Sequence, residues 1–476
     1  MPEQPTTLTS SQHRRAVVLA VSAAVGGFLF GFDSSVVNGA VDAIQHEFDL
    51  SSSVTGFAVA VALLGCALGA WLAGRAADRW GRPRAMLLGA VLFLVSSVGA
   101  AFAFAVWDLV LWRVVGGMCI GVASVITPAY ISEISPSAVR GRLASLQQLA
   151  ITLGIFAALL SDQLFATTAG AVDEGTPIAL GASLFGLDAW RWMFLVAVVP
   201  SVVYLVVALR APESPRHLVA TGRREEAADV LRSLGTQNAE DRVEQIAHAL
   251  ESDREKQQGS TLRGGRFGLR PVVWVGVTLS VFQQFVGINV IFYYSTTLWR
   301  SVGFDDSDAF LVSTITAVTN VVVTLVAIAL VDKVGRRPLL LFGSAGMAVS
   351  LAAMALAFTQ ATGSGDDVSL PGAWGTVALV GANLFVVSFG ASWGPVVWVL
   401  LGEMFPGDIR AAALALATAA QWIANFTVTV SFPPMSAGLG LPVVYGVYGA
   451  MALLSGLFVW KFVAETRGKE LEDMTD

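Results

Sequence analysis

Long runs without a single charged residue are the feature that most constrains this sequence. A bilayer core about 30 Å thick is crossed by a helix of about 20 mostly apolar residues. The runs that contain no Asp, Glu, Lys or Arg cover residues 16–32, 54–74, 85–107, 114–132, 143–161, 192–209, 271–299, 309–331, 338–365, 368–402 and 411–460. A chain with this pattern is predicted to be an all-α membrane protein.

Twelve membrane-spanning helices are predicted from these runs. The last run is long enough for two helices, and the segment SFPPMSAGLGLP at 431–442 is expected to form the turn between them. Paired prolines disfavour a continuing helix. The predicted spans are 16–41, 54–77, 85–105, 108–132, 141–163, 188–210, 271–300, 308–331, 338–361, 372–402, 409–432 and 441–463.

Charged residues are too few for a water-soluble surface. They make up 13% of the chain, whereas a soluble domain carries about 25%. The net charge of −6 argues against a nucleic-acid partner, and Cys66 and Cys119 both lie in apolar stretches. Neither a disulfide framework nor a cysteine metal site is therefore expected. We expect a lipid bilayer as a partner and no cofactor or metal.

The basic residues orient the chain, because Lys and Arg in short loops remain cytoplasmic. With the N-terminus inside, all but three of the 29 Lys and Arg residues fall on the cytoplasmic side, the exceptions being Arg113, Arg191 and Arg300. Both termini are therefore predicted to be cytoplasmic, in a protein of the cell membrane. Residues 162–190 contain acids, Asp162 among them, but no Lys or Arg, and are expected to form an external loop.

One long polar stretch, 211–270, lies between spans six and seven. It contains patches such as REEAADVLRSL that are typical of short amphipathic helices and is predicted to be a cytoplasmic linker. The expected domains are an N-terminal six-helix half at 1–210, this linker, a C-terminal six-helix half at 271–463 and a cytoplasmic tail at 464–476.

An internal repeat supports this division. Three motifs that combine acids with bases recur in the same order in both halves. They are GRAADRWGRP (74–83) with LVDKVGRRP (330–338), SEISPSAVRG (132–141) with GEMFPGDIRA (402–411), and PESPRHL (212–218) with AETRGKEL (464–471). Two similar halves in one membrane chain are typical of a transporter whose central site is alternately open to each side.

These motifs also carry a resemblance. The chain resembles the sugar porter family of the major facilitator superfamily, in particular bacterial proton-coupled xylose and glucose porters, through the segments GFLFGFD, DRWGRP, RVVGGMCIGV, SEISPSAVRG, PESPRHL, QQFVGINVIFYYS, DKVGRRP, SWGPVVWVLLGEMFP, AAQWIAN and ETRGKEL. The resemblance implies twelve helices in two pseudo-symmetric halves and sugar transport. Pro83 and Ala464 depart from the family pattern at the inner surface. Ala197 stands where the similar xylose–proton porter has a second acid, so a relay of two acids is not expected.

A sugar site needs groups that both donate and accept hydrogen bonds, together with an aromatic face. The uncharged runs contain such side chains, most of them in the C-terminal half. They are Gln148, Gln283, Gln284, Asn289, Asn320, Trp398, Gln421, Trp422 and Asn425. The resemblance matches these positions to sugar contacts and adds Phe30 and Gly394 to the lining of the pocket.

Spacing supports part of this assignment. Gln421 and Asn425 share a helix face, whereas Gln284 and Asn289 diverge on a straight helix. A break at Gly287 is therefore expected, and Tyr293 and Tyr294, on the outer side of it, are predicted to form an external gate.

Structural roles remain open for the same side chains. Asn and Gln commonly hydrogen-bond between membrane helices without any ligand. The two tryptophans, Trp398 and Trp422, are equally compatible with core packing. The adjacent pair Gln283 and Gln284, followed by Asn289, favours a binding site.

Inside the predicted membrane interior only Asp33 and Arg113 are ionisable, and a charge there is a functional hypothesis by default. Both are expected toward the outer side, where they are able to pair. In the functional interpretation Asp33 takes up and releases a driving proton while Arg113 competes for its carboxylate. The alternative is an ion pair that never titrates. Facilitative relatives carry an uncharged residue at the Asp33 position, so the resemblance implies proton coupling.

Acids and bases of the repeated motifs resemble the family's inner latch between the halves. The residues are the pairs Glu133/Arg140, Glu213/Arg216, Glu403/Arg410 and Glu465/Arg467, with Asp78 and Asp332. The alternative is that basic loops simply orient the helices.

The function expected is a proton-coupled symporter of a monosaccharide, with glucose as the preferred sugar, acting as a monomer. A facilitative uniporter is the alternative, and a membrane sugar sensor that does not transport is the alternative of another class. An enzyme is not expected, because the four histidines are scattered outside the spans.

Overall fold

The structure is a computed structural model. It describes residues 10–134, 140–168, 183–234, 236, 238–257, 262, 264, 268–362, 369–406 and 409–465, without the side chains of 10–23, 132, 140–145, 252–257, 306, 331–332 and 410–411. Within these residues, 12 helical segments are long and apolar enough to cross a membrane.

The first six segments form the N half. Its helices are α1 (Ser10–Glu47), α2 (Ser52–Trp80), α3 (Arg82–Ala101), α4 (Val106–Ile134), α5 (Arg140–Thr168), and α7 (Ala189–Leu195) followed by α8 (Val198–Arg210). A short hairpin of β1 (Ser183–Leu184) and β2 (Leu187–Asp188) precedes α7.

The last six segments form the C half. Its helices are α12 (Pro271–Phe285), α13 (Ile288–Tyr293), α14 (Ser295–Arg300), α15 (Asp306–Val334), α16 (Arg336–Phe358), α17 (Trp374–Gly390), α18 (Trp393–Met404), α19 (Arg410–Leu439) and α20 (Leu441–Phe462).

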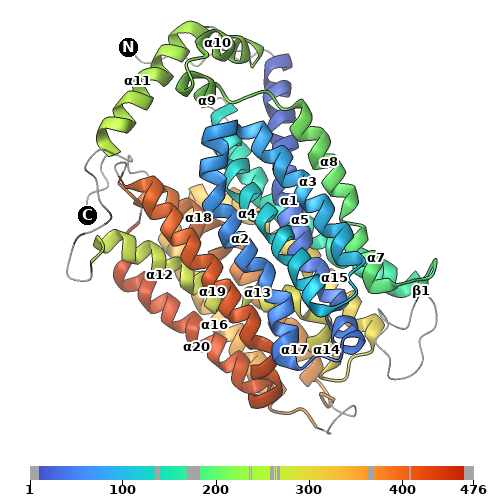
Figure 1. The fold of residues 1–476 in the computed structure, drawn as a ribbon. Helices are drawn as coiled ribbons and strands as arrows, with labels where there is room; N and C mark the ends of the chain where they lie inside the picture. The colour runs from blue at the N-terminus through green and yellow to red at the C-terminus, as the bar shows by residue number, and fades with distance from the viewer. Residues whose placement is uncertain are drawn as a thin grey trace.

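Three helices of the linker lie over one end of the bundle, which we call the linker end; the opposite end is the distal end (Figure 1). They are α9 (Pro215–Ala220), α10 (Arg224–Ser233) and α11 (Ala239–Gln257). Leu218, Ala227 and Leu231 belong to a small buried core that these helices share.

A polar cluster holds the linker end of the N half together. Gly81, between α2 and α3, has φ 88°, a backbone conformation that glycine adopts without strain. The next residue, Arg82, donates its backbone N–H to Glu213 Oε1 at 3.0 Å and its guanidinium to both oxygens of Glu133 at 3.1 Å. A Cβ on Gly81 would lie 1.8 Å from Glu213, so the turn and the cluster require each other.

The C half repeats this arrangement. Gly335 has φ 102° between α15 and α16. Arg336 donates its backbone N–H to Glu465 at 3.0 Å and its guanidinium to the two oxygens of Glu403 at 3.1 and 2.8 Å. The repeated motifs of the sequence thus form two equivalent clusters, as the predicted pseudo-symmetry requires.

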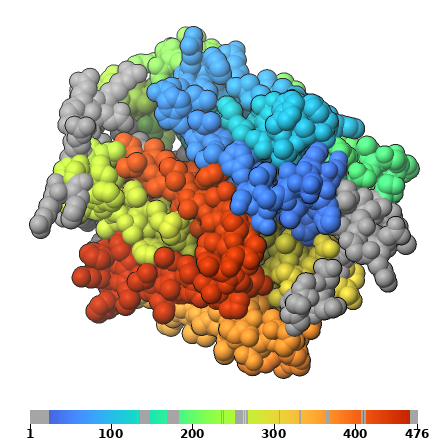
Figure 2. Space-filling view, turned by 60° about the horizontal axis from the view of Figure 1, so that its bottom comes forward, coloured from blue at the N-terminus to red at the C-terminus, as the bar shows by residue number. Residues whose placement is uncertain are grey.

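Helices of the two halves pack against one another in four places. α2 contacts α19, α5 contacts α15, and α1 contacts α13 and α14. Figure 2, in which the distal end is turned forward, shows the blue surface of the N half directly against the red surface of the C half.

The prediction that Pro433 and Pro434 form a turn is wrong. Helix α19 continues through both prolines to Leu439 and ends at Gly440. A proline removes the hydrogen bond to the carbonyl four residues earlier. The carbonyl of Thr429, freed by Pro433, instead accepts a hydrogen bond from Tyr294 Oη at 3.1 Å. A partner outside the helix compensates the loss.

Helices α2 and α4 approach closely through glycines. A Cβ on Gly69 would lie 2.0 Å from the carbonyl oxygen of Met118, and a Cβ on Gly117 would lie 1.9 Å from that of Ala62. Backbone atoms cannot move aside as a flexible side chain does, so this contact depends on residues without a Cβ.

Gly69→Ala is expected to destabilise the protein by about 1–3 kcal/mol, because the added methyl group forces α2 and α4 apart. Gly74→Ala is the matched control on the same helix, since a Cβ there meets nothing within 4 Å. Thermal unfolding in detergent should show a lower Tm for the first variant and an unchanged or higher Tm for the second. Equal losses in both variants would contradict this account of the packing.

Candidate functional site

The buried ion pair of α1 and α4 is the electrostatic centre of the site. Arg113 Nη1 donates to Asp33 Oδ1 at 3.2 Å and Oδ2 at 3.1 Å. Asp33 is 8% exposed and Arg113 5% exposed. The Nε of Arg113 has no partner among the described residues, and its guanidinium lies over the ring of Phe194. The structure therefore brings together the two charges that the sequence singled out.

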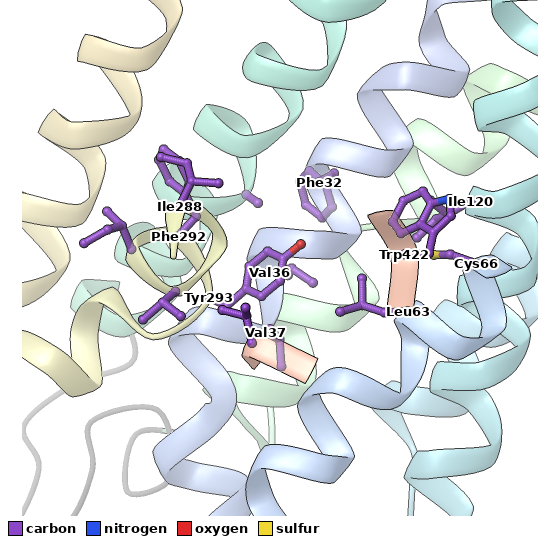
Figure 3. Packing of buried hydrophobic residues seen from close by; sticks show 14 of the residues in the cluster. Phe32, Val36, Val37, Leu63, Cys66, Ile120, Ile288, Phe292, Tyr293 and Trp422 are labelled. Atoms are coloured by element: carbon purple, nitrogen blue, oxygen red, sulfur yellow. The ribbon is translucent and has the colours of Figure 1, made fainter. Parts of the chain in front are cut away.

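A small cavity adjoins this pair. Its lining includes Asp33, Arg113, Ser34, Cys66 and Tyr293. Its volume of about 10 Å³ is room for about one water molecule. The carboxylate thus lies beside a space that water is able to occupy. Figure 3 shows four of the residues that line this cavity, Val37, Leu63, Cys66 and Tyr293, among the buried hydrophobic residues.

The helix is interrupted at Gly287, as predicted, and the interruption brings three side-chain amides within hydrogen-bonding distance. Gly287 has φ 83° between α12 and α13. Asn289 Nδ2 consequently reaches Gln284 Oε1 at 2.6 Å, and Gln284 Nε2 lies 3.4 Å from Gln283 Oε1. Gln283 Nε2 in turn donates to the carbonyl of Trp393 at 2.9 Å. The chain of amides ends at α18.

Helix α19 contributes polar groups that lack partners. Gln421, Trp422 and Asn425 are all buried. Gln421 Oε1 and Trp422 Nε1 have no hydrogen-bond partner among the described residues. The Trp422 ring meets the edge of Phe30 on α1 with 5.4 Å between centroids. A buried acceptor and a buried donor thus lie beside an aromatic surface that spans both halves.

The remaining predicted sugar contacts differ in exposure. Asn320 on α15 is buried, Gln148 on α5 is half-buried, and Trp398 on α18 is 38% exposed. The carbonyl of Gly394 lies 3.3 Å from Gln283 Nε2. The described hydrogen bonds do not connect these four residues to one another.

The two predicted gate tyrosines face different helices. Tyr293 is within hydrogen-bonding reach of Asn425 on α19 and Ser34 on α1, so it bridges the halves. Tyr294 donates to the carbonyl of Thr429 and packs on Phe432, both in the C half. The geometry suits a gate at Tyr293 and an anchoring contact at Tyr294.

Polar contacts between the halves at the distal end were missed by the sequence analysis. Asn38 Oδ1 accepts from the backbone N–H of Thr296 at 3.1 Å, and Asp42 pairs with Arg300 at 2.7 Å. Arg300 was one of three basic residues that the charge rule left on the wrong side. Its partner explains the exception, and Arg191 likewise pairs with Glu47.

The predicted latch acids are divided between the two clusters of the linker end. Glu133 binds Arg82 and Glu403 binds Arg336, so each of these contacts lies within one half. Neither arginine was among the predicted latch residues, although both directly follow the glycine of a repeated motif.

Other latch residues are only partly described. Asp78 is exposed, and its Oδ1 lies 3.7 Å from Arg82 Nη1. Arg216 is not without an interaction partner. The side chains of Arg140, Asp332 and Arg410, and the whole of Arg467, lie outside the described residues. The pairs predicted for them stay predictions.

The prediction that only Asp33 and Arg113 are ionisable in the membrane interior is wrong. Helix α5 continues to Thr168, and its Asp162 is 0% exposed. The uncharged run ends at Ser161, so the predicted external loop 162–190 begins with Asp162, which is also the penultimate residue of the predicted span 141–163. In the structure it is buried, as are Asp33 and, in the first turn of α4, Asp108.

Comparisons with known proteins agree with this architecture. A family described as "Sugar (and other) transporter" matches residues 19–476. A glucose transport protein of Synechocystis sp. is 50% identical over 473 residues, which is 99% of this chain and 100% of that protein. The D-xylose-proton symporter of Escherichia coli is 36% identical over 504 aligned positions, covering 98% of this chain and 96% of that one.

Solved structures give the same result. A partially occluded, inward-open structure of the xylose transporter XylE from E. coli has a TM-score of 0.81 at 36% identity, covering 96% of this chain and all of that one. The same transporter bound to 6-bromo-6-deoxy-D-glucose gives a TM-score of 0.78. These relatives are membrane transporters and not enzymes, and the chain belongs to the family of sugar transporters within the major facilitator superfamily.

Proposed function

We propose that the protein is a proton-coupled monosaccharide symporter that works by alternating access. The observation that carries the proposal is the buried pair of Asp33 and Arg113 beside a water-sized cavity. An uncharged sugar needs no charge in its site, so an acid buried in the bilayer is best explained by a second, charged substrate.

The geometry supports a simple role for each charge. When Asp33 is ionised, Arg113 holds its carboxylate through two hydrogen bonds and offsets its desolvation. When Asp33 binds a proton, the attraction falls and α1 is released from α4. Proton binding thus changes the packing of a helix that contacts the C half through α13 and α14.

Sugar binding is assigned to the amides of α12, α13 and α19. Buried polar groups without partners are costly, and Gln421 Oε1 and Trp422 Nε1 are such groups among the described residues. Hydroxyls of a sugar satisfy both, while the Trp422 and Phe30 rings cover its C–H face. The alternative role of these amides as structural links fits Gln283, which already binds α18.

Orientation follows from the basic residues. We place the linker end and both termini in the cytoplasm and the distal end outside, in a monomer of the cell membrane. The distal end is then closed by Asn38, Asp42, Thr296 and Arg300. Each linker-end cluster joins elements of one half. Its acids Glu133 and Glu403 are assigned to an inner latch with Arg140 and Arg410, whose side chains lie outside the described residues.

Glucose is the proposed substrate, because the relative with 50% identity is named a glucose transport protein. A facilitative uniporter is the alternative, and Asp33 argues against it. A sensor that does not transport needs a segment that passes on a signal, and none of the described segments has features that indicate such a role.

Asp33→Asn is expected to abolish accumulation of sugar against a gradient while leaving exchange of labelled for unlabelled sugar intact. Asn is neutral, as the protonated acid is, so the halves should move without a proton. Uptake into proteoliposomes with an imposed pH gradient measures the first activity, and counterflow measures the second. Vesicles with Asp33→Asn that still concentrate sugar would show that the proton is carried elsewhere.

Gln284→Ala is expected to weaken binding of glucose by about tenfold to a few hundredfold. Two or three buried hydrogen bonds, each worth about 0.5–1.5 kcal/mol net, are lost. Calorimetric titration of the purified protein measures the affinity. Gln360→Ala, an exposed glutamine, is the control and should bind normally. An unchanged affinity for Gln284→Ala would remove this residue from the site.

Asp42→Asn is expected to favour the state with an open distal end by up to about fivefold. The pair with Arg300 is partly exposed, 21% and 31% for the two side chains, and such a pair contributes about 1 kcal/mol or less. Distances between spin labels on the two halves measure the shift. Asp49→Asn, at an exposed acid of the same end, should leave them unchanged, and an unchanged distribution in Asp42→Asn would remove the pair from the closure.

A further inference from the structure

Asp162 is a buried acid that the proposed transport cycle does not use. Its side chain is 0% exposed. Oδ2 accepts a hydrogen bond from the backbone N–H of Gly39 on α1 at 3.1 Å, while Oδ1 has no partner among the described residues. One half of the carboxyl is thus satisfied by a neutral donor.

Close packing explains the burial. A Cβ on Gly39 would lie 2.8 Å from Met193 Sδ and 2.9 Å from Asp162 Cβ and Cγ. The missing side chain of Gly39 lets α1, α5 and α7 meet around the carboxyl. The carboxyl is therefore enclosed by protein and has no contact with bulk solvent in this structure.

Charged groups on the helices that pack against α5 have partners elsewhere. Arg113 on α4 pairs with Asp33, Arg191 on α7 pairs with Glu47, and Asp42 on α1 pairs with Arg300. On α15, the described side chains of Asp308 and Lys333 are exposed. An isolated carboxylate in an apolar interior neutralises rather than remain charged. This enclosure therefore favours the protonated, neutral form of Asp162 over the charged form.

Two contacts between the halves lie directly beside Asp162. Asn38, the neighbour of Gly39, accepts hydrogen bonds from Thr296 of the C half. Gln163, the neighbour of Asp162, accepts from Thr314 Oγ1 at 2.8 Å. Closure of the distal end and enclosure of the carboxyl therefore involve the same short segments of α1 and α5.

We propose that Asp162 is a second proton-binding group, distinct from Asp33, and that its carboxyl must take up a proton before the distal end closes. The proposal rests on the alternating access proposed above. When the distal end opens, α5 separates from α15 and water from that side reaches the carboxyl, which then ionises. Its proton enters from the distal solvent and returns to it. Asp162 thus controls closure and carries no proton across the membrane.

The two acids differ in what surrounds them. Asp33 has Arg113 as a partner and is able to be ionised while buried, whereas Asp162 has only the N–H of Gly39. Acid on the distal side is therefore expected to favour the closed distal end through Asp162. The opposing interpretation is a structural acid that keeps its proton in every conformation.

The test measures conformation and needs neither sugar nor transport. Spin labels are attached at Phe104→Cys and Gln360→Cys, two exposed positions at the distal ends of the N half and C half. The background carries Asp33→Asn to remove that proton site. Distances are measured by electron paramagnetic resonance in nanodiscs between about pH 5 and about pH 8, a range that spans the titration of buried carboxyls.

In this background the ratio of closed to open distal ends should rise by up to about tenfold for each pH unit lowered, as expected for one proton. Adding Asp162→Asn should make the ratio independent of pH and keep the distal end closed. Asn retains an acceptor for the N–H of Gly39, and Asp162→Ser provides a second neutral variant should Asn impair folding. Asp49→Asn, at an exposed distal acid, should retain the full pH dependence.

A pH dependence that survives in Asp162→Asn and Asp162→Ser overturns the proposal, and so does a background without any pH dependence. The symport proposal fails in a different measurement: it is contradicted when vesicles with Asp33→Asn still accumulate sugar. The two outcomes are therefore separable.

Discussion

Every polar group inside the bundle must find its partner within the protein, because the bilayer core offers no water. This constraint accounts for the main features of the site. Arg113 and Asp33 neutralise each other, and the broken helix at Gly287 is tolerated where amides line the interior. Among the buried groups without a described partner, Gln421 Oε1 and Trp422 Nε1 are the two assigned to the sugar. In the proposed function, binding of the substrate would supply hydrogen-bond partners to these two groups.

Motion of the halves depends on the same principle at the two ends of the bundle. At the linker end, Arg82 and Arg336 each tie two helices to the segment that follows the last helix of the same half, so each half is able to move as one body. At the distal end, hydrogen bonds and an ion pair join the halves directly. Strong contacts within the halves and fewer polar contacts between them are what a rocking transporter requires.

Much of this architecture was predictable from the sequence, and the failures have physical causes. Uncharged runs predicted the twelve spans, and helical periodicity predicted the break at Gly287. Asp162 was placed in a loop because a run of uncharged residues cannot show that an acid is buried by a neighbouring helix. The prolines of α19 were interpreted as a turn because the donor that replaces the lost hydrogen bond, Tyr294, lies on another helix. The partners of Glu133 and Glu403 are set by tertiary packing, which spacing along one chain does not encode.

The paired prolines of α19 have a mechanical consequence. Pro433 and Pro434 deprive the carbonyls of Thr429 and Val430 of their partners within the helix, so α19 is softer to bending at this point than its neighbours. One of these carbonyls binds Tyr294, and the other faces Gly56 of α2, where a Cβ would lie 2.8 Å from it. A flexible joint is therefore fastened on one side to its own half and rests on the other side against the opposite half. Separation of α2 from α19 would free the joint to flex. In the proposed alternating access, the stiffness of this helix would therefore change with the side to which the transporter is open.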